Sequence, residues 1–219
     1  MNILAKLETY IEEFNSLNND SFHIDTIRVE FSKEHKLSKL KEIGKWKKIA
    51  KNSSLIPKLK KRLLEKEITS VYRLENYNIY FYNSNRDKPK YRKAILVIFG
   101  MYQYNKKPIP KELIIKIINI LKNITSIDIC IDINKIPNFN ELKKYYPLTK
   151  YNKQISSQTH YINDRGILMI DNIVLYDKAL KNNLKGVLWR IEATISIPNI
   201  KYLALPLYEF KQIVDIARI

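Results

Sequence analysis

The sequence predicts an α+β protein with a mainly antiparallel central sheet and helices on one face of that sheet. Residues 125–134, "TSIDICIDIN", alternate between isoleucine and polar side chains, which is typical of a strand with one buried face. Residues 187–197, "VLWRIEATISI", alternate in the same way. Around these two strands, aromatic and β-branched stretches are interleaved with segments of helical apolar spacing, so we expect one sheet covered by helices.

The N-terminal part is expected to begin with an amphipathic helix over 3–17 and a strand over 22–31. Two helices are expected between Lys33 and Lys66. Apolar residues from Leu37 through Trp46 to Ile49 stripe the first of them, and Ser54 is placed to cap the second.

Aromatic and β-branched segments at 71–83 and 91–104 predict a hairpin, with its turn in 84–90. Pro110 then opens an apolar helix over 110–122, expected on the isoleucine face of the sheet. The remaining predicted elements are a short helix over 137–146, a second hairpin from 157–164 and 166–178 with its turn at 164–166, and a brief helix over 179–186 ending near Gly186. We expect a basic, helical N-terminal region over 1–70, integrated with an α+β core over 71–219.

The chain is strongly basic, with 39 Lys and Arg against 22 Asp and Glu and a formal net charge of +17. An AT-rich genome would enrich lysine without selection for binding, but it would not deplete acidic residues. The balance therefore favours a polyanionic partner over a merely soluble basic protein.

More than half of the excess positive charge lies between Lys33 and Lys66. This segment is predicted either to grip DNA or to form helices that cover the core with a solvated lysine face, and both can hold at once. The candidate DNA-binding residues in it are Lys45, Lys47, Lys48, Lys58, Lys60, Lys61 and Arg62.

Composition excludes several classes of site. Only four glycines are present, and neither phosphate-loop pattern, GxxxxGK[ST] or GxGxxG, occurs. The single cysteine, Cys130, excludes an intrachain disulfide or a cysteine-based zinc cluster and favours a cytoplasmic protein. The charged N-terminus and the short apolar runs predict neither a signal peptide nor a membrane partner.

Two stretches, "KELIIKIINILKNITSIDICIDI" and "THYIND…ILMIDNIVLYDKALKNNLKGVLWRIEATI", give the sequence a family resemblance. Their order and spacing over residues 70–200 resemble the replication initiation factor family, the rolling-circle initiators of plasmids and filamentous phages with related conjugative relaxases. Members carry an Arg-x-Asp-x-x-x-Asp strand, a Tyr-Asp-Lys-like element and an Arg-x-Glu strand. Ser126 stands here at the position of the first arginine, and the sequence has no His-hydrophobic-His pair. His23, His35 and His160 are expected to be structural or exposed.

The resemblance implies a palm-like α+β fold and a metal-dependent DNA nicking enzyme with a tyrosine nucleophile. It implies catalytic roles for Tyr176, Lys178 and Arg190. A lysine beside the tyrosine would lower the pKa of the phenol or bind the scissile phosphate. Tyr161 is the alternative nucleophile, and Tyr146 and Tyr151 are further candidates.

Carboxylates on a DNA-binding face would recruit a divalent cation, Mg²⁺ or Mn²⁺. The candidate ligands are Asp128, Glu192 and Asp132. Because Asp128 and Asp132 lie roughly 13 Å apart along a regular strand, the expected pair is Asp128 with Glu192 from a neighbouring strand. The alternative is a cross-strand charge ladder in which these carboxylates pair with Arg190 and surface lysines.

Two functions follow from these features. The first is a replication initiator that binds double-stranded origin DNA and single-stranded DNA and nicks one strand. The second is a non-catalytic DNA-binding regulator that has the same fold. A homodimer is left open by the sequence.

Overall fold

The computed structural model describes residues 3–63, 65, 67–75, 77–84, 93–102, 108–151, 158–162 and 166–219. The chain forms two compact units, the first from Met1–Thr9 and Thr26–Thr125 and the second from Tyr10–Asp25 and Ser126–Ile219. This division differs from the predicted boundary at residue 70, because residue 70 lies inside a strand of the first unit.

The sheet of the first unit is antiparallel, with strand order β2-β3-β4-β5-β1. Its strands are β1 (His23–Ser32, with 26–32 in this unit), β2 (Trp46–Lys48), β3 (Ile68–Leu74), β4 (Ile79–Ser84) and β5 (Lys93–Phe99). Helix α2 (Lys33–Lys41) lies on the face that carries Trp46, whose indole donates to Leu40 O at 3.0 Å, and helix α4 (Lys111–Leu121) contacts α2.

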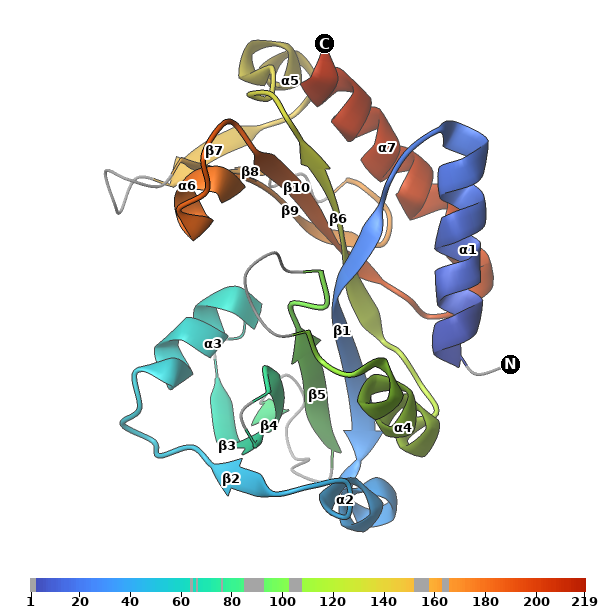
Figure 1. Ribbon diagram of the computed structural model, residues 1–219, viewed down its shortest axis with the longest axis vertical. Helices are drawn as coiled ribbons and strands as arrows, with labels where there is room; N and C mark the ends of the chain where they lie inside the picture. The colour runs from blue at the N-terminus through green and yellow to red at the C-terminus, as the bar shows by residue number, and fades with distance from the viewer. Residues whose placement is uncertain are drawn as a thin grey trace. The chain divides into compact units, whose positions relative to one another are not determined.

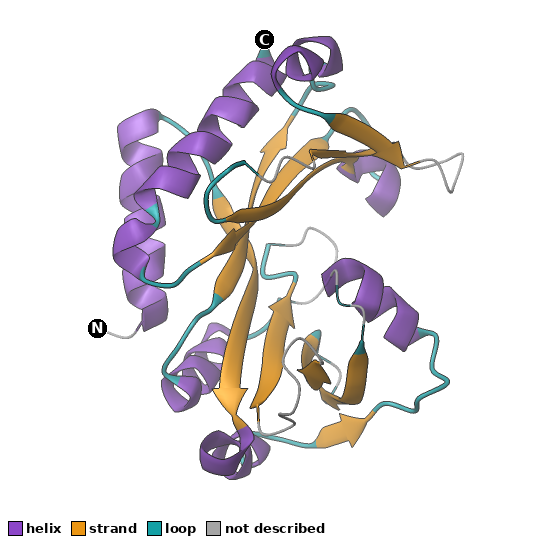
Figure 2. Ribbon diagram, turned by 180° about the vertical axis from the view of Figure 1, so that it is seen from behind, coloured by secondary structure: helices purple, strands orange, loops and turns teal. Residues whose placement is uncertain are grey.

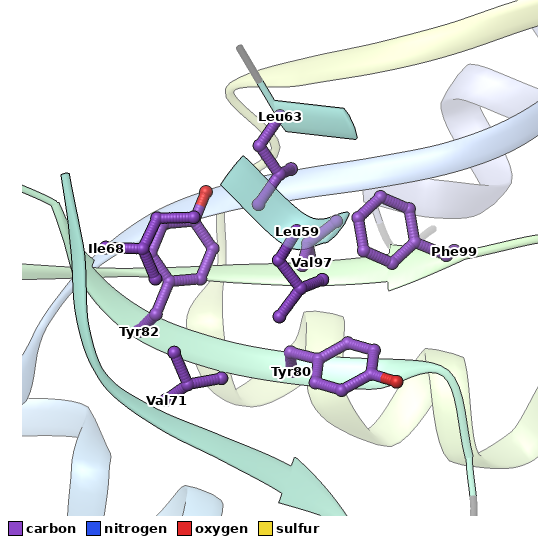
Figure 3. Packing of buried hydrophobic residues seen from close by; sticks show 8 residues of the cluster. All are labelled: Leu59, Leu63, Ile68, Val71, Tyr80, Tyr82, Val97 and Phe99. Carbon is purple, nitrogen blue, oxygen red and sulfur yellow. The ribbon is translucent and has the colours of Figure 1, made fainter. Parts of the chain in front are cut away.

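Helix α3 (Leu55–Leu63) covers the opposite face of the same sheet. Figure 3 shows Leu59 and Leu63 pointing into a cluster of residues from three strands. The strand residues of this cluster are Ile68, Val71, Tyr80, Tyr82, Val97 and Phe99. The i, i+4 spacing of the two leucines gives the helix one apolar side, so its lysines are left on the outer side.

The sheet of the second unit is also antiparallel, with strand order β6-β10-β9-β8-β7. These strands are β6 (Ser126–Ile133), β7 (Leu148–Tyr151), β8 (Thr159–Ile162), β9 (Ile170–Asp177) and β10 (Trp189–Ser196). The isoleucines of β6 are buried, as their alternation predicted. Strict period-two patterning thus identified both β6 and β10, and the α+β fold class is confirmed.

Helix α7 (Ala204–Arg218) contacts β10 and the short helix α5 (Phe139–Tyr145). It meets the part of α1 (Ile3–Asn18) that belongs to this unit, where Phe14 and Tyr208 have ring centroids 5.0 Å apart (the helices are labelled in Figure 1 and seen from behind in Figure 2). The remaining elements of this unit are α6 (Lys178–Asn182) and the single-turn helix η1 (Ile200–Tyr202). The predicted helix 110–122 forms α4 in the first unit, whereas α7 contacts β10 in the second, so its placement on the isoleucine face of the sheet stays a prediction.

Four further predictions need correction. The first predicted helix of 33–66 ends at Lys41, and Trp46 enters β2 because that segment pairs with β3. Ser53, not Ser54, accepts the hydrogen bond at the start of α3. Residues 71–83 contain parts of two strands, β3 and β4, that pair with each other. Helix α6 ends at Asn182, before Gly186, and its C-cap Asn183 is in the left-handed conformation. The predicted turns at 84–90 and 164–166 lie wholly or mostly outside the described residues.

His160 on β8 gives the second unit a pH-dependent stability. Its ring stacks on Phe139 at 3.9 Å, and burial, with the charges of Lys150 and Lys143, lowers its pKa. The unfolded chain therefore binds the proton more tightly, so the free energy of unfolding is highest above pH about 6.5 and falls as the pH drops through that value.

We expect His160→Leu to flatten this fall, measured as the urea midpoint between neutral pH and pH about 5. A residual slope should remain, because burial also lowers the pKa of His23. His35→Leu, at an exposed position of α2, is the matched control. An unchanged slope in His160→Leu would contradict this account.

Candidate active site

The polar faces of β6 and β10 form one surface, as predicted. The register places Asp132 opposite Arg190, Cys130 opposite Glu192, and Asp128 opposite Thr194. Strand β9 adds Tyr176, which lies opposite Arg190 on the other side of β10. Because side chains directly opposite each other point to the same face, these groups share one surface of the second unit.

Arg190 is the centre of a buried charge network. Its Nε and Nη2 donate to the two carboxylate oxygens of Asp132 at 2.7 and 2.9 Å, and its Nη1 donates to Asp25 Oδ1 at 3.1 Å. Lys178 Nζ donates to the same Asp132 at 3.3 Å. The negative charges of the two carboxylates and the positive charges of the two cations thus balance in a site from which water is largely excluded.

Arg190 and Lys178, for which catalytic roles were predicted, both belong to this network, and those roles stay predictions. The two residues are only 2% and 4% exposed, and both are bound to Asp132. Burial and the charge of Arg190 lower the pKa of Lys178, while Asp132 opposes that shift. Asp132 thus holds both cations on the polar face.

Tyr176 lies at the end of β9, where Asp177 caps α6 by accepting from Leu180 N at 2.8 Å. Its hydroxyl donates a long hydrogen bond of 3.4 Å to Glu192 Oε2. Burial raises the pKa of Tyr176 well above its usual value of 10.0, and the charge of Glu192 raises it further against the opposing effect of Arg190. The pKa of Tyr176 is thus shifted in the direction opposite to the one expected from a neighbouring lysine.

Lys181 is a residue of the site that the sequence interpretation missed. Its Nζ lies 4.1 Å from the centroid of the Tyr176 ring, and the residue is exposed. Lys178 and Lys181 are three positions apart and so lie on one side of α6. That spacing was a usable signal, but the sequence does not reveal that the first lysine is buried by Asp132 and the second remains at the surface.

The three candidate carboxylates have different environments. Asp132 is committed to Arg190 and Lys178, Asp128 accepts from Thr194 Oγ1 at 2.7 Å, and Glu192 accepts from Tyr176. Among the described residues, no three His, Cys, Asp or Glu side chains gather as a metal-binding group. Asp128 and Glu192 are diagonal neighbours on the shared face and carry the oxygen ligands that a divalent cation prefers, with Asp128 only 3% exposed, whereas Asp132 is bound to Arg190 and Lys178. That Asp128 and Glu192 hold a cation stays a prediction.

The alternative tyrosines lie on other elements of the second unit. Tyr161 on β8 is opposite Val174, which puts it on the same face as Tyr176 and one strand farther from Glu192. Tyr146 ends α5, and the side chain of Tyr151 lies outside the described residues.

The candidate DNA-binding residues all belong to the first unit. Lys45, Lys47 and Lys48 are exposed in and beside β2, and Lys58, Lys61 and Arg62 are exposed on α3, with Lys60 half-buried. Helix α3 therefore covers the core with its leucines, as one of the two alternatives predicted, while DNA binding by its cations stays a prediction. Among the described helices, none has the length and apolar character that crossing a lipid bilayer requires.

Comparison with protein-family models and with curated proteins gives no match. Among solved structures, the chain is similar to a rolling circle replication initiator protein from Geobacillus stearothermophilus. The two are 16% identical, the similarity covers 89% of this chain and 79% of the other, and the TM-score is 0.46. The roles of individual residues rest on the geometry of this chain.

Proposed function

We propose that the protein is a DNA strand-transferase of the rolling-circle initiator type, which binds origin DNA and nicks one strand through Tyr176. The observation that carries this proposal is the grouping of a hydroxyl, a carboxylate and an exposed cation at one place. Tyr176 donates to Glu192, and Lys181 lies over the Tyr176 ring. These are the groups that attack on a phosphodiester requires: a nucleophile, a proton acceptor and a positive charge for the phosphate.

In the proposed step, the Tyr176 oxygen forms a bond to phosphorus and the bond from phosphorus to the 3′ oxygen breaks. The phenolic proton passes to Glu192 and from there to water, and the 3′ oxygen leaves as a hydroxyl after receiving a proton from water on the opposite side of phosphorus. The product is a phosphotyrosine link that conserves the phosphodiester bond, so the strand can be rejoined by reversal.

Glu192 is essential to this scheme because Tyr176 does not ionise by itself near neutral pH. Its raised pKa keeps the phenol protonated, so the proton must leave during the attack. The hydrogen bond to Glu192 already points that proton toward a base. Lys181, which lies over the Tyr176 ring, then neutralises charge on the phosphate.

Asp128 and Glu192 would hold the divalent ion, Mg²⁺ or Mn²⁺. When bound, such an ion would offset negative charge on the scissile phosphate. Thr194 orients Asp128 by donating to it. Asp132 instead holds Lys178 and Arg190 in place on the same face.

DNA affinity is proposed to come largely from the basic segment of the first unit. We expect replacement of Lys58, Lys60, Lys61 and Arg62 by alanine to flatten the dependence of log K on log salt. Each phosphate that the variant no longer neutralises should change the slope for duplex DNA by about 0.9. Fluorescence anisotropy over a salt series measures this, and a slope equal to that of wild type would remove α3 from the DNA interface.

A second function, a non-catalytic DNA-binding regulator, is favoured by one observation. The pKa of Tyr176 is raised, whereas an activated nucleophile more often has a lowered one. A nicking assay on supercoiled plasmid carrying the protein's own origin, with Mg²⁺ or Mn²⁺, distinguishes the two. Conversion to open circles supports the strand-transferase, and binding without conversion supports the regulator.

A further inference from the structure

Two half-buried aromatic residues lie together near one edge of the sheet of the first unit. The register places Lys48, Tyr72 and Phe81 opposite one another on β2, β3 and β4, so these three side chains share a face. Trp46 lies two residues before Lys48 on β2 and therefore points to the same face. Strand β2, which follows α2 in the chain, is at the end of the strand order (Figure 1).

The rings of Tyr72 and Trp46 are both held against the buried ring of Phe81. The Tyr72 ring is stacked on it, with centroids 4.7 Å apart and an angle of 16° between the planes. The Trp46 ring is tilted by 59° with its centroid at 4.8 Å. The indole Nε1 of Trp46 also donates to Leu40 O at 3.0 Å, so its orientation is set by a hydrogen bond as well as by packing.

Tyr72 and Trp46 differ in exposure from the aromatic residues behind them. Phe31 and Phe81 are 4% and 3% exposed and meet edge to face with centroids 6.3 Å apart, as core residues do. Tyr72 and Trp46 are only half-buried. These two residues therefore keep part of their surface in solvent, at the outer end of an aromatic stack.

The lysines around the two rings give this edge a positive charge. They come from the last turn of α2, whose Leu40 O binds the indole, and from β2 and the residue before it, and all are exposed: Lys39, Lys41, Lys45 and Lys48. Two exposed acidic residues, Glu42 and Glu75, lie in the same region, so the balance is positive. Aromatic rings among exposed cations are typical of single-stranded DNA sites, because bases stack on the rings while the cations neutralise phosphates.

We propose that Trp46 and Tyr72 form a stacking site for unpaired bases of single-stranded DNA, with the surrounding lysines neutralising the backbone. The inference rests on the proposed DNA-binding function and deepens it, because it gives the single strand a site of its own. Bases of a duplex already stack on one another, so this site selects the unpaired strand.

The test compares Tyr72→Leu with Tyr72→Phe. Leucine removes the ring and keeps an apolar side chain against Phe81, whereas phenylalanine removes only the hydroxyl. In fluorescence anisotropy, Tyr72→Leu should bind a labelled single-stranded oligonucleotide about 5- to 150-fold more weakly than wild type. Tyr72→Phe should restore the tight binding, and the affinity of Tyr72→Leu for duplex should change little.

Tyr202→Leu is the matched control variant. Tyr202 is an exposed tyrosine of the second unit, and Lys201 Nζ lies 4.8 Å from the centroid of its ring. If a tyrosine beside a lysine were sufficient for stacking, this variant would also lose affinity for the single strand. It should instead bind both kinds of DNA like wild type.

An oligonucleotide of abasic sugars separates stacking from charge, because it keeps the phosphates and lacks the bases. Wild type should bind it more weakly than an ordinary strand of the same length, and Tyr72→Leu should discriminate less between the two. The chain has two tryptophans, so Trp189→Phe leaves Trp46 as the single reporter. The ordinary strand should quench its emission and the abasic strand should not, a result that needs no substitution at the site.

Two results would overturn the inference but not the proposed function, provided that wild type binds DNA. One is equal affinity of Tyr72→Leu and Tyr72→Phe for the single strand. The other is equal affinity of wild type for the ordinary and abasic strands, with no quenching of Trp46. Wild type that binds neither single-stranded nor duplex DNA overturns both.

Discussion

Phenylalanine in place of Tyr176 is expected to abolish the covalent protein–DNA adduct and leave DNA affinity unchanged. The substitution removes one oxygen, the atom proposed to attack phosphorus, and preserves the ring on which Lys181 rests. Affinity should persist because the basic residues proposed to bind DNA are in the first unit. Adducts are resolved from unlinked protein by denaturing gel with end-labelled DNA.

Tyr161→Phe is the matched control, since Tyr161 lies on the same sheet face one strand away and loses the same atom. It should form the adduct at the wild-type rate. Glu192→Gln should slow adduct formation by about 10²–10⁴-fold, the usual contribution of a positioned base. An adduct that persists in Tyr176→Phe and disappears in Tyr161→Phe would show that the nucleophile is Tyr161 on β8.

Replacement of Arg190 by methionine is expected to lower the free energy of unfolding by about 3–5 kcal/mol. The side chain is 2% exposed and makes three hydrogen bonds to two carboxylates. Without it, Asp25 and Asp132 remain buried with Lys178 as the nearby cation of the network. Arg190→Lys should also be costly, because one ammonium cannot reproduce the fork that binds Asp132.

A double variant separates the charge imbalance from the lost packing. Arg190→Met with Asp25→Asn leaves Asp132 paired with Lys178, so it should be more stable than Arg190→Met. Lys185→Met, at an exposed position, should leave the unfolding midpoint unchanged. The measurement is guanidinium unfolding, and a loss below about 1 kcal/mol for Arg190→Met would mean that water reaches the network.

Local periodicity was sufficient to predict the elements that have one buried and one exposed face. Strands β6 and β10 follow directly from alternating isoleucines, and α1 follows from its apolar stripe. Helix α7 was missed although Leu207, Phe210 and Val214 recur at helical spacing and are buried. Trp46 was placed in a helix because a single turn of apolar spacing does not reveal a short edge strand, whose pairing partner lies elsewhere in the chain.

The sequence predicted which residues share the polar face but not which of them bind each other. Alternation placed Asp128, Asp132, Arg190 and Glu192 on one face, and the register confirms it. The partner of Arg190 on β1 is 165 residues away, so no local pattern could indicate that Asp25 and Asp132 share its guanidinium. For the same reason, the sequence could not show that Lys178 binds Asp132 while Lys181 lies over the ring of Tyr176.

The most direct test of the central claim is to identify the residue that becomes linked to DNA. Wild-type protein is incubated with single-stranded and supercoiled DNA carrying its origin, in Mg²⁺ or Mn²⁺. Adducts are isolated under denaturing conditions, digested with nuclease and protease, and sequenced by mass spectrometry. The account predicts a nucleotide on the peptide that contains Tyr176. A nucleotide on any other tyrosine, or the absence of adducts from protein that binds the same DNA, would contradict it.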